Sequence, residues 1–183
     1  KSCAGSRRSS DVWPVEHATM ELDIGVDNPE ADDVRALLGV HLAFSHEATP
    51  VEFSFALDAN RLTEAGVTFF SARRRGDLVA IAALKRLDDG HAELKSMHTQ
   101  EAQRGREVGR AMVAHVLAFA RREGYRRVSL ETGSTQEFLS ARRLYEKVGF
   151  RPCEPFGDYK PSPYNTFMTI DVNADPLDGV APC

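Results

Sequence analysis

Cysteine is scarce in this chain of 183 residues. Only three are present, Cys3, Cys153 and Cys183, and no two of them have the spacing of a metal site. An odd and low count argues against a disulfide framework and against structural zinc, so we expect no metal. The cysteines are typical of a reduced, cytoplasmic protein, and a bridge between Cys3 and Cys183 stays open as an alternative.

Long apolar runs and an excess of positive charge are also missing. No stretch approaches the roughly 20 apolar residues of a membrane span, and no N-terminal stretch has the apolar centre of a signal peptide. Lysine and arginine number 23 against 27 aspartates and glutamates, which gives a formal net charge of −4. A chain of that charge is poorly suited to bind nucleic acid or an anionic membrane, so we expect neither as a partner.

What the chain does contain is the composition of an ordinary folded domain. Hydrophobic residues make up 42% and charged residues 27%, and 183 residues are enough for one complete core. The stretches 1–19 and 173–183 are polar and without periodicity. We therefore predict one domain over 20–172, with a flexible extension at 1–19 and a flexible tail at 173–183.

Apolar periodicity and turn residues predict that strands and helices alternate through this domain. Strands are expected over 21–26, 67–74, 78–87, 91–99, 128–132 and 164–172, and helices over 30–46, 53–65, 106–123 and 134–148. Arg75-Gly76-Asp77 is expected to form a hairpin turn. Ser134 and Glu137 have the spacing of a capping box at the start of the last helix. This order predicts an α/β fold with a mixed central sheet flanked by four helices.

The stretch 93–150 carries the clearest functional signal. A short loop with one glycine leads directly into the helix over 106–123, whose first-turn N–H groups have no partner inside the helix. The positive end of the helix dipole favours an anion at this place. Arg104, Arg106 and Arg110 add positive charge at the same end. The sequence therefore predicts a phosphate site, with an exposed basic loop that binds nothing as the alternative.

Two segments of this stretch resemble a known family. Gln103-Arg104-Gly105-Arg106-Glu107-Val108-Gly109 resembles the acetyl-CoA-binding loop of the GNAT superfamily of N-acetyltransferases, and Leu144-Tyr145-Glu146-Lys147-Val148-Gly149-Phe150 resembles its LYEKxGF segment. The resemblance covers about 20–172. The loop over 153–159, Pro163 to Met168 and Glu93 to Met97 are similar to a subgroup of small, uncharacterised bacterial GNAT proteins.

The resemblance implies a GNAT fold, with about six or seven strands and four helices, and acetyl-CoA as co-substrate. It also implies that the strands over 91–99 and 128–132 splay apart, and that the pantetheine arm of acetyl-CoA lies in the gap. Two positions depart from the family pattern, since Glu107 stands where a glycine is expected and Phe138 where an asparagine is frequent. The implied cofactor-binding residues are Met97, His98, Thr99, Arg104, Gly105, Arg106, Glu107, Val108, Gly109, Arg110, Thr132, Phe138 and Tyr145.

Three residues are candidates for catalysis. The nucleophile must be a neutral amine, so the site needs a group that takes a proton. The resemblance implies Glu93 as this base, with an ion pair to Lys95 or Arg86 as the structural alternative. His98 is the second candidate base, because an imidazole titrates near neutral pH. Tyr145 aligns with the family's tyrosine that gives a proton to the departing thiolate.

The function expected from this resemblance is transfer of an acetyl group from acetyl-CoA to a primary amine of a small molecule, by direct attack in a ternary complex. Four acidic residues could attract a cationic acceptor, namely Glu52, Glu131, Glu154 and Asp158. Two alternatives stay open. One is an acyl-CoA-binding sensor without turnover, and the other is an acetyltransferase that acts on a protein N-terminus or lysine. A homodimer is possible.

Overall fold

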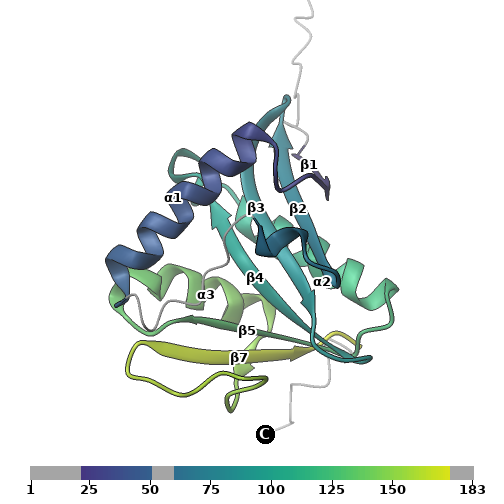
Figure 1. Ribbon diagram of the computed structural model, residues 1–183, viewed down its shortest axis with the longest axis vertical. Helices are drawn as coiled ribbons and strands as arrows, with labels where there is room; N and C mark the ends of the chain where they lie inside the picture. Colours follow the sequence, from purple (N-terminus) through teal and green to yellow (C-terminus); the bar gives the residue numbers. More distant parts are fainter. Residues whose placement is uncertain (1–21, 51–59, 174–183) are drawn as a thin grey trace, which may run out of the picture.

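The computed structural model describes residues 22–50 and 60–173, which form one mixed sheet of seven strands with α-helices on both faces (Figure 1). The strand order is β1-β2-β3-β4-β5-β7-β6, and only β4 and β5 are parallel. The strands are β1 (Leu22–Val26), β2 (Val67–Arg74), β3 (Asp77–Arg86), β4 (His91–Thr99), β5 (Arg127–Gly133), β6 (Arg151–Pro152) and β7 (Asn165–Asp171). The helices are α1 (Asp32–Ala48), α2 (Val108–Arg122) and α3 (Leu139–Val148).

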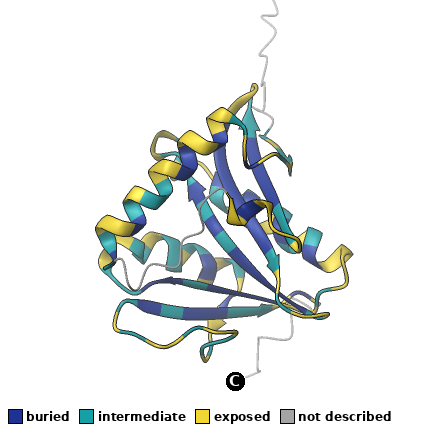
Figure 2. Cartoon of the chain, in the orientation of Figure 1, coloured by how far each residue is buried: buried dark blue, intermediate teal, exposed yellow. Residues whose placement is uncertain are grey.

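Each face of the sheet has its own apolar core. Helix α1 covers one face, where Val34 and Leu38 pack with Ile81 of β3. Helices α2 and α3 cover the other face, where the predicted stripe on α2 is buried, as its Met112 and Val116 show. Figure 2 shows the middle strands buried along most of their length, while the helices expose their outer faces.

The hairpin between β2 and β3 follows from two residues. Arg75 and Gly76 have positive φ angles of 55° and 89°, as a two-residue type I′ turn requires. Their right-handed twist matches that of the flanking strands, and β2 and β3 run on as an antiparallel pair with one irregularity, between Ala72 and Arg73. The predicted turn at Arg75-Gly76-Asp77 is therefore confirmed.

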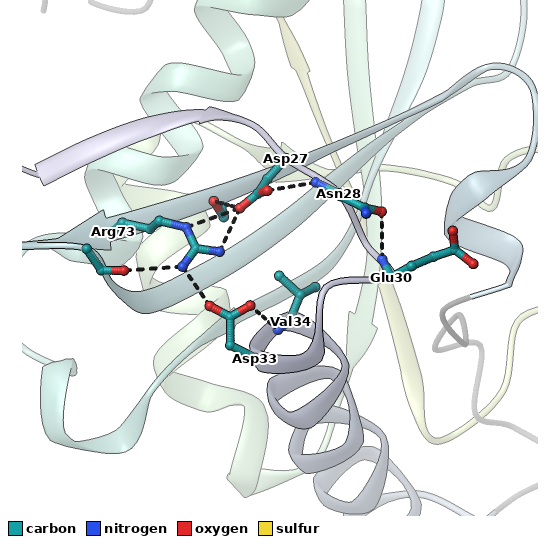
Figure 3. Close-up of polar contacts among 8 residues, drawn as sticks. Asp27, Asn28, Glu30, Asp33, Val34 and Arg73 are labelled. Atoms are coloured by element: carbon teal, nitrogen blue, oxygen red, sulfur yellow. Dashed lines mark hydrogen bonds and ion pairs between the residues drawn. The ribbon is translucent and has the colours of Figure 1, made fainter.

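Arg73 holds the start of α1 against the sheet. Its guanidinium lies between two carboxylates, with Nη2 2.9 Å from Oδ2 of Asp27 and Nη1 2.6 Å from Oδ2 of Asp33 (Figure 3). Asp27 follows β1 and Asp33 lies in the first turn of α1. The Asn28 side chain accepts a hydrogen bond from the N–H of Glu30 and so forms the turn between the two elements.

The fold prediction is confirmed in its class and corrected in three details. The described residues contain three α-helices rather than four, because only a short 3₁₀ helix, Arg61–Thr63, lies in the described end of the predicted helix over 53–65. Residues 51–59 lie outside the described part. The capping box at Ser134 is wrong, since the Ser134 hydroxyl donates to the carbonyl of Pro163 and α3 begins only at Leu139.

The third correction concerns the segment after α3, which lies outside all the predicted strands and helices. Its first two residues form β6, which pairs with the outer edge of β7. The predicted flexible ends stay predictions, since 1–21 and 174–183 are outside the described residues. Within the described part, no helix is long and apolar enough to cross a membrane.

Candidate active site

The site begins where β4 and β5 stop pairing. Their parallel ladder has only three residue pairs and ends at Glu93 and Ser129, although both strands continue. On its other edge, β4 has an irregularity against β3 at Ser96 and Met97, where Ser96 takes a positive φ of 51°. Such a bulge bends a strand and turns its backbone groups. The two strands therefore diverge, and the backbone of β4 after Glu93 faces a gap.

A cavity of about 370 Å³ occupies this gap. Its wall comes from the second half of α1, the ends of β4 and β5, and the starts of α2 and α3. The predicted cofactor residues all line this cavity except Arg106. The other lining residues are His41, Phe44, Ser45, Thr49, Leu94, Lys95, Ser96, Gln103, Glu131, Gly133, Glu137, Ser140, Ala141 and Leu144.

One end of the cavity has the features of an anion site. Helix α2 begins at Val108, and the side chain of its N-cap residue accepts no hydrogen bond from the backbone N–H groups of the first turn. The N–H groups of that turn therefore stay available. Arg104 and Arg110 line the cavity at this end, and Arg106 is exposed beside them. This arrangement suits the phosphates of a nucleotide-like ligand.

Glu107 departs from the family pattern in its charged side chain but not in its backbone conformation. It has φ 62° and ψ 0°, the left-handed region that glycine adopts without penalty and other residues adopt at a cost. Its carboxylate is exposed and lies 3.1 Å from the guanidinium of Arg110. The backbone thus keeps the shape that a glycine would take, while the side chain pairs with one of the cavity's arginines.

Tyr145 is placed on the cavity wall by α3. Its side chain is 6% exposed and packs edge-on against Phe150, with the ring centroids 5.7 Å apart. Burial, with the nearby Glu131 as a smaller cause, raises the pKa of Tyr145 well above its ordinary value. The phenol therefore keeps its proton at neutral pH and can donate a hydrogen bond into the cavity.

Glu93 is buried in an ion pair rather than exposed to the cavity. Its carboxylate lies 2.9 Å from Nζ of Lys95 and accepts a hydrogen bond from the Tyr159 hydroxyl. The side chains of Glu93 and Lys95 are 4% and 8% exposed. The pairing to Lys95 that the sequence left open is therefore present, whereas Arg86 contacts Asp89 instead. Glu93 as the base stays a prediction.

His98 faces the cavity together with His41 of α1. The two rings meet edge-on, with their centroids 5.4 Å apart. Burial lowers the pKa of each to about 4, with the charge of Arg104 as a second cause at His98 and that of His98 at His41. Both imidazoles are therefore neutral at pH 7 and are weak proton acceptors.

The sequence did not name Glu131 as a catalytic candidate, only as a group that could attract a cation. It lies on β5 two residues beyond the last pair with β4, and it lines the cavity. Burial raises the pKa of this carboxyl to about 7, where Lys95 opposes the shift and Glu93 adds to it. One sequence feature could have pointed to Glu131: it is a charged residue inside a predicted strand, between the apolar Leu130 and the β-prone Thr132. Of the other three acidic candidates, Glu154 and Asp158 are exposed and Glu52 lies outside the described residues.

Phe138 narrows the cavity where the family pattern has an asparagine. Its ring occupies the space beside Gly133, so closely that a Cβ built on Gly133 would lie 2.1 Å from Cδ2 of the ring. The same ring meets Phe44 of α1 edge-on, with the centroids 5.2 Å apart. Gly133 at the end of β5 is therefore required by this close approach.

A family model described as the acetyltransferase (GNAT) family matches residues 34–150. The chain belongs to this family. This GNAT protein is 38% identical to the uncharacterized N-acetyltransferase YsnE of Bacillus subtilis, over 81% of its own chain and 98% of the relative. It is 40% identical to the uncharacterized N-acetyltransferase YedL of Escherichia coli, over 75% and 86% of the two chains. The family and these relatives identify the protein as an acetyl-CoA-dependent N-acetyltransferase.

The fold of this GNAT protein is also found in solved structures. A putative acyl-CoA N-acyltransferase from Klebsiella pneumoniae has a TM-score of 0.68 at 25% identity, covering 82% of this chain and 97% of that one. A GNAT family acetyltransferase from Elizabethkingia anophelis with acetyl-CoA bound has a TM-score of 0.61 at 15% identity, over 82% and 97%. Among residues 22–50 and 60–173, no three His, Cys, Asp or Glu residues are grouped to hold a metal ion.

Proposed function

We propose that this GNAT protein transfers the acetyl group of acetyl-CoA to a primary amine of a small molecule, by direct attack in a ternary complex. The observation that carries the proposal is the cavity between the diverging β4 and β5. An arginine-lined helix end forms one part of its wall, and Glu131 and the α1 residues form another. The two parts of this wall thus suit the two reactants.

The residues of the gap fit acetyl-CoA as co-substrate. The N–H groups at the start of α2, with Arg104 and Arg110, suit the diphosphate. Beyond Glu93 the edge of β4 that faces β5 has no strand partner. The amide groups of a pantetheine arm can pair with such an edge as an added strand would.

The chemistry requires a neutral amine. An alkylamine has a pKa near ~10.4, so removing its proton at pH 7 costs about 4.6 kcal/mol at 1.36 kcal/mol per pH unit. The amine nitrogen then attacks the thioester carbonyl, and the oxygen gains negative charge. A backbone N–H of the bulged segment near Met97 can stabilise this charge. Glu93 and His98 are the bases predicted from sequence.

Collapse of the intermediate breaks the C–S bond and releases the CoA thiolate. Tyr145 keeps its proton and lines the cavity, so it can donate a hydrogen bond to this thiolate. Cys153, which is half-buried and has a pKa raised by burial, is not among the cavity-lining residues. This supports direct transfer over a route through an acyl-cysteine.

Two observations favour a small acceptor over a protein. A cavity of about 370 Å³ is in the range of small-molecule sites. The segment between β6 and β7 is also fixed against β4, because Tyr159 bonds to both Glu93 and Lys95. A peptide would need an open groove at this face of the sheet.

The proposal is tested by incubating the protein with acetyl-CoA and a panel of primary amines, while a thiol reagent reports free CoA. We expect CoA release that depends on the amine and an acetylated amine by mass spectrometry. CoA binding by calorimetry without consumption of any amine would favour the sensor, to which Glu107 in the glycine position lends support. Acetylation of peptides but not of small amines would favour the protein acetyltransferase.

A further inference from the structure

Glu131 lies on the face of the sheet that α1 covers, at the point where β4 and β5 part. Ser129 is paired with Glu93, and alternate residues of a strand face the same side, so Glu131 shares a face with Glu93 and Lys95. Lys95 is paired in turn with Ala83 of β3, which packs in the core beneath α1. Glu131 therefore enters the cavity from the side opposite to α2 and α3.

The charges around Glu131 leave its carboxyl available to a ligand. The titratable groups that interact electrostatically with it are Lys95 and Glu93 of β4, Tyr145 of α3 and Tyr159 of the β6–β7 segment. Lys95 is held by Glu93 and by the Tyr159 hydroxyl, and its ammonium also lies 5.2 Å from the centroid of the Tyr159 ring. The ammonium of Lys95 is therefore bound by Glu93 and Tyr159 rather than by Glu131.

We propose that Glu131 binds the ammonium group of the acceptor and takes its proton, and that the acceptor is therefore a primary amine that is a cation in solution. This inference rests on the proposed acetyl transfer and deepens it. It assigns to β5 the role that sequence reasoning gave to Glu93 or His98 on β4.

The other candidate groups are less suited to this step. Glu93 already holds two partners and does not line the cavity. His98 and His41 have pKa values lowered by burial to about 4, while burial raises the pKa of Glu131 to about 7. A base is most effective when its pKa lies near the working pH.

The proposed step balances without any further reactant. An N–H bond of the ammonium breaks and an O–H bond forms on Glu131, which leaves the lone pair on nitrogen for attack on the thioester carbon. The N–C bond forms and the C–S bond breaks. The amine nitrogen loses its second proton as the amide forms, and one proton remains on the released CoA thiol. The proton on Glu131 then passes to solvent, which returns Glu131 to its carboxylate form.

The test compares acceptors that differ in their need for a base. n-Butylamine, phenethylamine and putrescine are cations at pH 7, whereas methoxyamine is neutral there. We expect Glu131→Gln to lower kcat/KM about 100-fold for the cationic amines, because a general base contributes about 10²–10⁴-fold. The loss should be much smaller for methoxyamine. Glu146→Gln, which removes an exposed carboxylate on α3, is the matched control and should match the wild type.

Further measurements separate a proton acceptor from a structural group. The wild-type kcat/KM for the cationic amines should rise with pH through an apparent pKa near 7, because only the carboxylate accepts a proton, and this rise should vanish in Glu131→Gln. Glu131→Asp should keep the rise at a lower rate. Circular dichroism and CoA calorimetry report whether each variant is folded and binds CoA.

The outcomes distinguish this inference from the proposed function. If the wild type acetylates the cationic amines and Glu131→Gln matches it, Glu131 is not the base, while the acetyl transfer stands. An equal loss with all four amines also overturns the inference, because it marks a structural effect. If the wild type acetylates none of the amines, the proposed function fails and the inference fails with it.

Discussion

Replacing Glu107 with glycine tests both the backbone and the charge at the mouth of α2. The residue has a φ of 62°, and a non-glycine residue in this region costs about 1–2 kcal/mol. Glycine removes that cost but makes the unfolded chain more flexible, which costs about 0.4–1 kcal/mol. The backbone terms alone thus give a gain of about 0–1.6 kcal/mol in the free energy of unfolding, with a middle value of about 0.8 kcal/mol.

The matched control is Glu107→Gln, which removes the charge but keeps the strained backbone. Both variants lose the exposed ion pair with Arg110, so that loss, worth about 0.3–0.5 kcal/mol, cancels between them. Urea denaturation should therefore find the glycine variant more stable than the glutamine variant. Equal stability of the two would show that position 107 carries no backbone strain.

The same pair of variants measures the effect of the carboxylate on CoA. The Glu107 side chain is 75% exposed, so water-like screening applies and two unit charges about 4 Å apart repel by about 1 kcal/mol. Calorimetry at low salt should then find CoA bound about fivefold more tightly by both variants, since about 1.4 kcal/mol is tenfold. If neither variant binds CoA more tightly than the wild type, the carboxylate does not act on the phosphates.

Three further substitutions test other parts of the structure. Tyr145→Phe should lower kcat by about 10–100-fold with little change in the KM for acetyl-CoA, because a hydrogen bond to a charged group is worth about 1.5–3 kcal/mol; an unchanged kcat would remove Tyr145 from the mechanism. Gly133→Ala should destabilise the protein by about 1–3 kcal/mol through overpacking against Phe138, and a second change, Phe138→Ala, should restore stability if that ring is the cause. Arg73→Met should cost about 2 kcal/mol by thermal denaturation, since it removes the guanidinium that Asp27 and Asp33 share. Arg75→Met at the exposed hairpin tip should cost under about 0.5 kcal/mol, and equal effects of the two changes would contradict the role given to Arg73.

The fold was predictable because its signals are local. Apolar periodicity marks α2, and Gly76 marks the tight turn of the β2–β3 hairpin. The wrong capping box at Ser134 shows where local reasoning stops. Its hydroxyl bonds to Pro163, which is distant in the sequence, and no spacing rule can reveal such a partner.

The candidate site was predictable in its location and less so in its charges. The loop before α2 and the position of Tyr145 could be inferred from motif segments. The protonation of His98 and Glu131 depends on how deeply each is buried and on neighbours from other strands. The engagement of Glu93 by Tyr159 joins residues 66 positions apart, so it too became visible only in the folded chain.

The short ladder between β4 and β5 divides the sheet into two blocks. β1 to β4 form an antiparallel block, and β5, β7 and β6 form a second, with three residue pairs as the hydrogen-bonded seam between them. Helix α2 packs against β3 and β4 of the first block and against α3 (Figure 1). A molecule that binds along the seam would contact both blocks and so make the whole sheet stiffer.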